Sequence, residues 1–218
     1  MLRVVLIGSP VAHSLSPQMQ NAAFAARGLD WTYEACDVAP EELEGVVRGL
    51  ETGANVTAPY KLEVARMLGS ELPSVNTLVV RSGEIEAHST DTAILQGLEF
   101  GRPAILGDGG AAVAFKQALP EARVFSRRGE WPPDVAETDL VINATPVRDE
   151  VLVELRAGQT LVDLPYPESA TAEAARASGA RVFDGLEVLV AQGAASFELW
   201  TGVPAPVDVM RRAVGLTP

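Results

Sequence analysis

Short apolar segments that are typical of buried strands alternate with longer mixed segments in the first part of the chain. Val4–Ile7 is a continuous apolar run, and Trp31–Cys36 alternates between apolar and polar positions. Helices are predicted over residues 17–27 and over residues 40–50, and each has a proline at its start. A third short strand leads into the polar stretch Gly53–Lys61. This βαβαβ order predicts a parallel sheet with right-handed crossovers.

The next segment predicts an antiparallel hairpin followed by a helix. Residues 75–80 and 84–88 have strand-like composition and flank Ser82-Gly83, a pair that favours a tight turn. Residues 92–100 are amphipathic and are expected to form a helix that ends at Gly101. The first sheet should therefore be mixed, with an antiparallel pair added to the parallel strands.

A second α/β unit is predicted after this helix. Its expected strands are residues 104–106, 123–125, 139–143, 160–164 and 181–183. One helix is expected to end near residue 119, and another is expected over residues 170–178. Two further helices are expected at residues 186–200 and 207–214. The chain is therefore expected to have an α/β fold with two domains, residues 1–91 and 92–185, followed by C-terminal helices over residues 186–218.

Composition restricts the class of function. Of the 218 residues 47% are hydrophobic, enough for real cores, and the formal net charge of −12 disfavours binding to nucleic acid or to an anionic membrane. The one cysteine, Cys36, excludes an internal disulfide and is expected to be buried. Two histidines without metal-ligand spacing predict no metal site. The pattern contains neither a signal peptide nor a membrane span, so the protein is expected to be cytoplasmic.

Polar residues gather where the predicted strands of the first domain end. The turn from strand to helix after Gly53 presents Asn55, Thr57 and Lys61 at one strand end. About thirty residues later, Asp91 ends a second polar cluster. A lysine and an aspartate brought together from two segments can act as a proton-transfer pair. Because an acidic chain needs a local cation to bind an anionic substrate, Lys61 is a candidate functional residue.

Ser14 and Ser16 lie in the loop that follows the first strand. Ser16 is predicted to be the N-cap of the first helix, with Pro17 as the first helical residue. Both hydroxyls also lie at the carboxyl end of a strand, where open α/β sheets bind ligands. A ligand-binding role for Ser16 is therefore an equal alternative to a capping role.

The loop after residues 104–106 has a dinucleotide-binding pattern. Gly107-Asp-Gly-Gly-Ala-Ala112 is G-x-G-x-x-A between a predicted strand and helix, which allows backbone N–H groups to approach a pyrophosphate closely. Arg127 and Arg128 follow the next strand, where an NAD enzyme usually has an acid, and they suit the 2′-phosphate of NADP. Asp108, inside the turn, is expected to repel the pyrophosphate.

With these motifs in order along nearly the whole chain, the sequence resembles shikimate dehydrogenases. The shared blocks are H-S-L-S-P at residues 13–17, N-V-T-A-P-Y-K at 55–61, V-N-T at 75–77, S-T-D at 89–91, G-D-G-G-A-A at 107–112, N-A-T-P at 143–146, D-L-P-Y-P at 163–167 and Q-G-A-A-S-F-E-L-W-T-G at 192–202. The resemblance implies NADPH-dependent reduction of 3-dehydroshikimate to shikimate, on the path to chorismate and aromatic amino acids, by a monomer or homodimer. It also implies that residues 186–218 return to the first domain.

The resemblance assigns roles residue by residue. Lys61 would be the catalytic group with Asp91 as its partner, and Ser14 and Ser16, with help from Tyr166, would hold the substrate carboxylate. The full set of implied substrate-binding residues is Ser14, Ser16, Thr57, Lys61, Asn76, Asp91, Tyr166 and Gln192. The implied NADP-binding residues are Gly107, Gly109, Gly110, Ala111, Ser126, Arg127, Arg128, Asn143 and Thr145.

The chain departs from the family pattern in several places. Ser89 stands where N-T-D has asparagine, Gln20 stands where a histidine is usual, Asp108 replaces a small residue, and several segments are short. Two alternatives stay open: a methylenetetrahydrofolate dehydrogenase-like enzyme, which also pairs a lysine with this layout, and a trimmed paralogue that binds ligand with little turnover. The serine pair and Gln192 favour a small polyhydroxylated acid over a folate.

Overall fold

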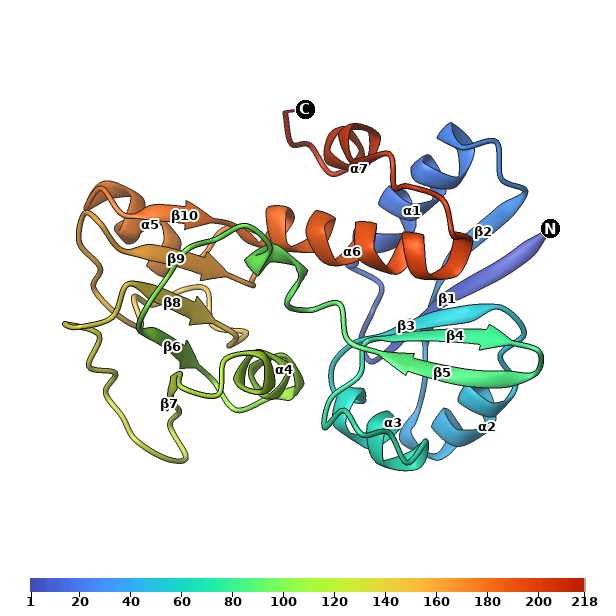
Figure 1. Ribbon diagram of the computed structural model, residues 1–218, viewed down its shortest axis with the longest axis horizontal. Helices are drawn as coiled ribbons and strands as arrows, with labels where there is room; N and C mark the ends of the chain where they lie inside the picture. The colour runs from blue at the N-terminus through green and yellow to red at the C-terminus, as the bar shows by residue number, and fades with distance from the viewer. Residues whose placement is uncertain (218) are drawn as a thin grey trace. The chain divides into compact units, whose positions relative to one another are not determined.

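The predicted strands form two separate five-stranded sheets in the computed structural model, which describes residues 1–217 (Figure 1). Unit 1 contains residues 1–93 together with the residues from 190 onward, and unit 2 contains residues 94–189. The chain returns to unit 1 within the long helix α6, Gly185–Thr201, which confirms the predicted return of the C-terminal helices. Among the helices of residues 1–217, none is both long and apolar enough to cross a membrane.

The sheet of unit 1 is mixed, as predicted. Its strands are β1 Leu2–Gly8, β2 Trp31–Asp37, β3 Gly53–Val56, β4 Thr77–Arg81 and β5 Glu84–His88, in the spatial order β2-β1-β3-β4-β5. β1 is parallel to β2 and β3, whereas β4 pairs antiparallel with β3 and β5. Ser82 and Gly83 both have positive φ in the turn between β4 and β5, which matches the twist of a tight hairpin.

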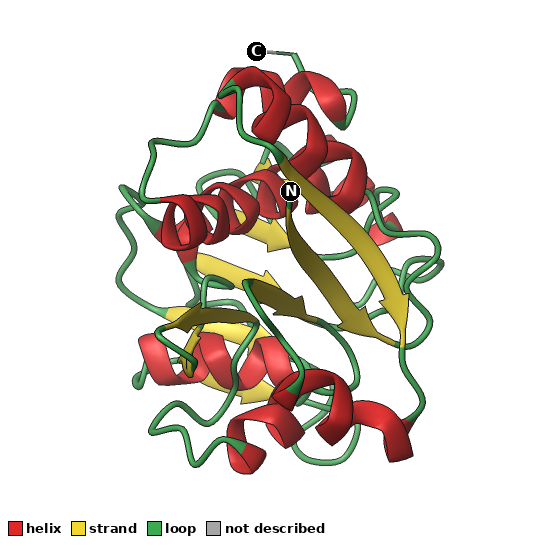
Figure 2. Cartoon of the chain, turned by 90° about the vertical axis from the view of Figure 1, so that its right-hand side faces the viewer, coloured by secondary structure: helices red, strands yellow, loops and turns green. Residues whose placement is uncertain are grey.

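Helices cover both faces of this sheet (Figures 1 and 2). They are α1 Ser16–Ala26, α2 Leu43–Arg48 with the preceding 3₁₀ turn η1 Pro40–Glu42, α3 Lys61–Met67, the part of α6 from residue 190, and α7 Val207–Ala213. α2 and α3 bury Leu43 and Val64 in one cluster with Ile7 of β1. On the other face, Phe24 of α1 stacks on Phe197 of α6 with ring centroids 5.4 Å apart.

The sheet of unit 2 is fully parallel. Its strands are β6 Pro103–Leu106, β7 Arg123–Phe125, β8 Leu140–Asn143, β9 Thr160–Asp163 and β10 Arg181–Phe183, in the order β10-β9-β8-β6-β7. α4, Gly110–Ala118, buries Phe115 on one face, and α5, Ala170–Ala177, buries Ala172 on the other. This doubly wound arrangement is a Rossmann-like architecture, in agreement with the dinucleotide-binding pattern predicted for residues 107–112.

The predicted helix over residues 92–100 and the predicted burial of Cys36 are both wrong. Residues 92–100 contain only the 3₁₀ turn η2, Ala93–Leu95, in place of the expected amphipathic helix. Gly97 has a φ of 80°, and this left-handed backbone interrupts a helix. Ile94 and Leu95 still pack on the face of the second sheet that α4 covers. The apolar spacing of this segment therefore reflects burial of its side chains and not a helix. Cys36 is only half-buried, although it was expected to be buried.

Each sheet has a switch point, at which the connections to the two neighbouring strands of one strand run in opposite directions along the sheet. In unit 1, β1 lies between β2 and β3, and in unit 2, β6 lies between β7 and β8. Open α/β sheets bind ligands at the carboxyl ends of the strands at such points. The loops after β1 and β3, and the Gly-rich turn after β6, are therefore where functional side chains are expected.

Candidate active site

The carboxyl ends of β1 and β3 are joined at the switch point of unit 1. Thr57 N, just after β3, donates to Ile7 O of β1 at 2.8 Å. The loop that carries Ser14 and Ser16 follows β1, and the helix that begins with Lys61 follows β3. Candidate ligand-binding residues from two separate motifs are therefore anchored at the same edge of the sheet.

Lys61 and Asp91 form an ion pair that is largely buried. Lys61 is the first residue of α3, and its Nζ lies 2.7 Å from both carboxylate oxygens of Asp91. The Lys61 side chain is 14% exposed and that of Asp91 8%, so water screens the pair only weakly. The structure thus brings together two residues that are 30 positions apart in the sequence.

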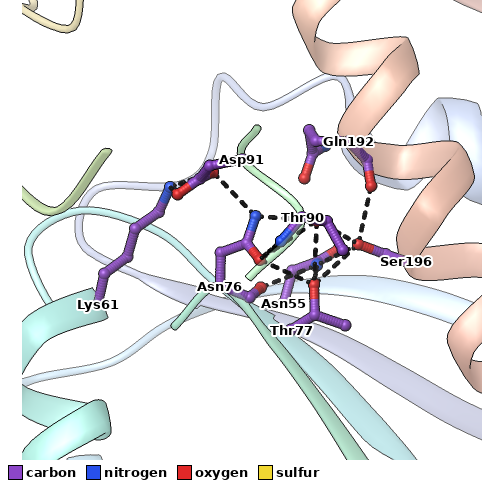
Figure 3. Close-up of polar contacts among 8 residues, drawn as sticks. All are labelled: Asn55, Lys61, Asn76, Thr77, Thr90, Asp91, Gln192 and Ser196. Carbon is purple, nitrogen blue, oxygen red and sulfur yellow. Dashed lines mark hydrogen bonds and ion pairs between the residues drawn. The ribbon is translucent and has the colours of Figure 1, made fainter. Parts of the chain in front are cut away.

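Asn76 donates a further hydrogen bond to the Asp91 carboxylate (Figure 3). Its Nδ2 lies 2.9 Å from Asp91 Oδ1, while its Oδ1 accepts from the backbone N–H of Thr90 at 2.7 Å. Because a backbone N–H can only donate, that second contact fixes which end of the amide is the oxygen. The amide nitrogen must then face Asp91, and Lys61 and Asn76 together orient the carboxylate.

Ser196 on α6 is the centre of a buried polar network next to this pair (Figure 3). Its Oγ lies 3.0 Å from Asn55 Nδ2, 2.9 Å from Thr77 Oγ1 and 3.0 Å from Thr90 Oγ1. Its single hydroxyl proton is donated to the backbone carbonyl of Gln192 at 2.9 Å, so Ser196 Oγ accepts from Asn55. The network joins α6 to β3, β4 and the turn that carries Asp91, all within unit 1.

Sequence reasoning missed most of this network. Thr77, Thr90 and Ser196 are absent from the predicted site. Asn55 was expected to be presented at the strand end, but it is buried and accepts from the Tyr33 hydroxyl at 2.8 Å. Two signals in the sequence could have indicated the network. Polar residues inside apolar strands need buried hydrogen-bonding partners. Ser196 also lies four positions after Gln192, a predicted ligand-binding residue, so the two are neighbours on one face of α6.

Ser14 and Ser16 lie at the start of α1. The N-cap of α1 is Leu15, and Ser16 is the first helical residue, so the prediction that Ser16 is the N-cap is wrong. The Ser14 hydroxyl instead accepts from Ser16 N at 3.2 Å. Because Ser14 takes an N–H group at the helix start that would otherwise lack a partner, the Ser16 side chain is not needed as a cap.

The remaining predicted substrate residues are divided between the units. Thr57 follows β3 and Gln192 lies on α6, so both belong to unit 1 with Ser14, Lys61 and the other predicted substrate residues. Tyr166 follows β9 and belongs to unit 2. The predicted substrate set therefore lies in unit 1 with the single exception of this tyrosine.

The Gly-rich turn of unit 2 joins β6 to α4. Gly107 has a φ of 113°, and a Cβ built on it would lie 3.0 Å from Ala144 O, so a larger residue would strain the turn. Gly109 is the N-cap of α4, and no side chain in residues 1–217 caps this helix. A Cβ on Gly109 would meet nothing within 4 Å, which leaves the first N–H groups of the helix approachable. This donor set fits the pyrophosphate of a dinucleotide.

Both arginines after β7 are paired with carboxylates. Arg128 donates from Nε to Asp108 Oδ2 at 2.8 Å and from Nη2 to Asp108 Oδ1 at 2.5 Å, and Arg127 donates to Glu150. Hydrogen bonds from the Arg128 guanidinium hold the pKa of Asp108 below its usual range, and Asp108 in turn raises the pKa of Arg128. Asp108, which is expected from the sequence to repel the pyrophosphate, therefore has a counter-ion from the neighbouring strand end.

Asn143 and Thr145 shape the loop after β8, next to the Gly-rich turn. Asn143 Oδ1 accepts from Thr145 N at 3.1 Å and from Thr145 Oγ1 at 2.7 Å. Asn143 Nδ2 donates to Asp163 Oδ1 at 2.7 Å, and both side chains are fully buried. Burial raises the pKa of the Asp163 carboxyl. These bonds fix the loop whose carbonyl, Ala144 O, faces Gly107.

The two units together define a class of protein. Unit 2 has a doubly wound parallel sheet with a Gly-rich strand–turn–helix at its switch point, which is the arrangement of dinucleotide-binding domains. Unit 1 has a lysine–aspartate pair at the ligand-binding edge of its own sheet. The class is that of two-domain α/β oxidoreductases that use a nicotinamide dinucleotide.

Comparisons with known proteins give the family. Residues 6–77 match the family model of the shikimate dehydrogenase substrate binding domain, and residues 185–214 match that of the shikimate 5′-dehydrogenase C-terminal domain. A protein of Anaeromyxobacter sp. (strain Fw109-5) named shikimate dehydrogenase (NADP(+)) is 37% identical, with 96% of this chain and 94% of that protein aligned. The chain belongs to the shikimate dehydrogenase family.

Solved structures agree with this assignment. Shikimate dehydrogenase from Aquifex aeolicus has a TM-score of 0.86 at 28% identity, with 99% of this chain and 98% of that chain covered. Shikimate 5-dehydrogenase from Thermus thermophilus, in complex with NADP(H) and shikimate, has a TM-score of 0.82 at 31% identity, with 98% of each chain covered. The Anaeromyxobacter alignment extends over 262 positions, against 218 residues here, so that relative contains residues without a counterpart in this chain.

Proposed function

We propose that this chain catalyses the reversible, NADPH-dependent reduction of 3-dehydroshikimate to shikimate, in the synthesis of chorismate and the aromatic amino acids. The observation that carries the proposal is the Lys61–Asp91 pair, in which Nζ lies 2.7 Å from both carboxylate oxygens at the ligand-binding edge of unit 1. The relative named for NADP(+) and the homologous structure with NADP(H) and shikimate support it.

Lys61 is proposed to hold the proton that ketone reduction requires. The carbonyl oxygen gains negative charge as its carbon is reduced, and an ammonium group beside that oxygen both donates a proton and offsets the charge. Asp91 orients the ammonium group, and Asn76 orients Asp91. NADPH, when bound, supplies the hydride.

The remaining side chains of the site are assigned to the recognition of substrate. Ser14 and Ser16, with Tyr166, are proposed to donate hydrogen bonds to the substrate carboxylate, since hydroxyl groups donate readily to an anion. The ring hydroxyls are assigned to Thr57, Asn76, Asp91 and Gln192, whose carboxylate, amide and hydroxyl groups can accept or donate.

Unit 2 is proposed to bind NADP and unit 1 to bind the substrate, in line with the predicted division into residues 92–185 and residues 1–91 with 186–218. The proposed cofactor contacts are Gly107, Gly109, Gly110 and Ala111 at the pyrophosphate, Ser126, Arg127 and Arg128 at the adenosine ribose and its 2′-phosphate, and Asn143 and Thr145 in the loop after β8. Location in the cytoplasm and a monomeric or homodimeric state stay predictions.

The proposal is tested by measuring the formation of NADPH through its absorbance. Wild-type protein given shikimate and NADP should produce NADPH, and Lys61→Ala should produce it far more slowly. Absence of NADPH formation by folded wild-type protein would contradict the proposal. In that case, turnover of methylenetetrahydrofolate with NADP would indicate the folate enzyme, and calorimetric binding of shikimate without turnover would indicate a trimmed paralogue.

A further inference from the structure

Asp108 and Arg128 form a two-point ion pair between the loops in which the adenosine end of NADP is expected to bind. Nε and Nη2 of Arg128 donate to the two oxygens of Asp108 at 2.8 and 2.5 Å. Asp108 lies inside the Gly-rich turn after β6, Arg128 follows β7, and these two strands are paired neighbours. A carboxylate of the chain itself therefore occupies one binding edge of the guanidinium group.

That same edge of Arg128 suits a phosphate. Arginine binds carboxylates and phosphates alike through two parallel N–H···O bonds, so Asp108 and a 2′-phosphate present the same kind of acceptor. A phosphate that reaches Arg128 also meets the negative charge of Asp108. NAD has a hydroxyl group at this position, which needs no cation and can donate to a carboxylate. Asp108 therefore disfavours the 2′-phosphate and tolerates the 2′-hydroxyl.

We propose that Asp108 is a specificity-determining residue, which competes with the 2′-phosphate of NADP for Arg128 and so narrows the preference of this chain for NADP over NAD. The proposal rests on the proposed function of unit 2 as the cofactor-binding domain. The Arg128 side chain is 82% exposed and that of Asp108 37%, so solvent weakens the pair and a phosphate can displace the carboxylate. The expectation from the sequence was different: repulsion between Asp108 and the pyrophosphate would disfavour both cofactors equally, because both contain that group.

Calorimetric titration of NADP and of NAD into the full-length protein measures the effect. Asp108→Asn removes the charge and keeps the size of the side chain. We expect it to tighten NADP binding about two- to fivefold and to change NAD binding by less than about 1.5-fold. In an Arg128→Ala background, Asp108→Asn should no longer favour NADP.

Glu137→Gln is the matched control. Glu137 also pairs with an arginine in unit 2, because Arg102 Nη1 donates to it at 2.7 Å, and the substitution changes the net charge by the same amount. Arg102 directly precedes β6, at the end of that strand away from the Gly-rich turn. Glu137→Gln should leave the ratio of the two dissociation constants unchanged.

Three outcomes would overturn the proposal. Equal tightening of both cofactors by Asp108→Asn would place the action of Asp108 at the shared pyrophosphate. No change in either dissociation constant would make the ion pair a surface contact only, and if the wild type oxidises shikimate with NADP, the proposed function would still stand. Failure of the wild type to bind either cofactor would contradict the proposed function and this proposal together.

Discussion

Lys61 Nζ lies 2.7 Å from both carboxylate oxygens of Asp91, so the ammonium group faces the carboxylate as a whole. Asn76 donates to one of the same oxygens at 2.9 Å. Lys61 therefore cannot move without breaking an ion pair that is largely shielded from water. A proton donor held in one place in this way removes part of the orientational entropy that the reaction would otherwise lose.

Lys61→Ala should lower turnover of shikimate by about 10²–10⁴-fold, the usual contribution of a general acid–base group. The Michaelis constant should change much less, because other side chains are expected to hold the substrate. Lys61→Arg is the control, since it keeps the positive charge but releases a proton poorly. Steady-state kinetics, with circular dichroism to confirm folding, measure both. Retention of more than about a third of wild-type turnover by Lys61→Ala would remove Lys61 from the mechanism.

Ser14→Ala and Ser16→Ala should mainly raise the Michaelis constant for shikimate, on the order of tenfold or more. Hydrogen bonds to a charged group contribute about 1.5–3 kcal/mol, and a carboxylate remote from the reacting carbon changes little in the transition state. Ser9→Ala is the matched control from the same loop, because the Ser9 hydroxyl already donates to Asp37 at 2.6 Å. Wild-type binding of shikimate by both variants would show that the carboxylate is held elsewhere.

Ser196→Ala should lower the free energy of unfolding by about 1–3 kcal/mol, because it leaves buried hydrogen-bonding groups, among them Asn55 Nδ2, with one partner fewer. The exposed Ser178, whose hydroxyl donates to Ala175 O at 2.8 Å, provides the control in Ser178→Ala. Urea unfolding of the two variants compares them. An equal loss of stability would mean that the Ser196 network adds nothing beyond an ordinary serine–carbonyl bond.

Asp163→Asn should stabilise the protein at neutral pH and have a smaller effect in acid. Burial raises the pKa of Asp163 in the folded state above its unfolded value of about 3.9, so the folded state binds the proton more tightly. The contribution of protonated Asp163 to the free energy of unfolding is fully present below the pKa that Asp163 has in the unfolded state. It is lost as the pH rises through the pKa that Asp163 has in the folded state. Asparagine does not titrate, and its Oδ1 can still accept from Asn143.

The measurement for Asp163 is urea unfolding of wild type and variant between about pH 4 and pH 8. The stability of the variant minus that of the wild type should grow with pH and then become constant. Asp134→Asn, at a carboxylate that is 71% exposed, is the control and should show no such trend. A difference that shrinks as the pH rises would contradict the raised pKa.

The sequence by itself determined the elements whose signals are local. The strand runs, the Ser82-Gly83 turn, the Gly-rich turn at Gly107 and the start of α3 at Lys61 depend on contacts within a few residues, so periodicity and turn chemistry were enough. Local signals also explain the errors. The apolar spacing of residues 92–100 resembled a helix although Gly97 interrupts it, and Ser16 had a capping composition although Ser14 takes that role.

Only the tertiary structure decided which polar groups meet. Ser196 joins Thr77 across 119 positions of sequence, and Arg128 neutralises Asp108 across 20. The first contact exists because α6 returns to the sheet of unit 1, and the second because β6 and β7 are neighbours. A side chain in the sequence has a charge and a hydrogen-bonding capacity but no partner. The partner is fixed when strands and helices distant in sequence pack to bury apolar surface, and the polar groups buried with them must then be satisfied by whatever lies within reach.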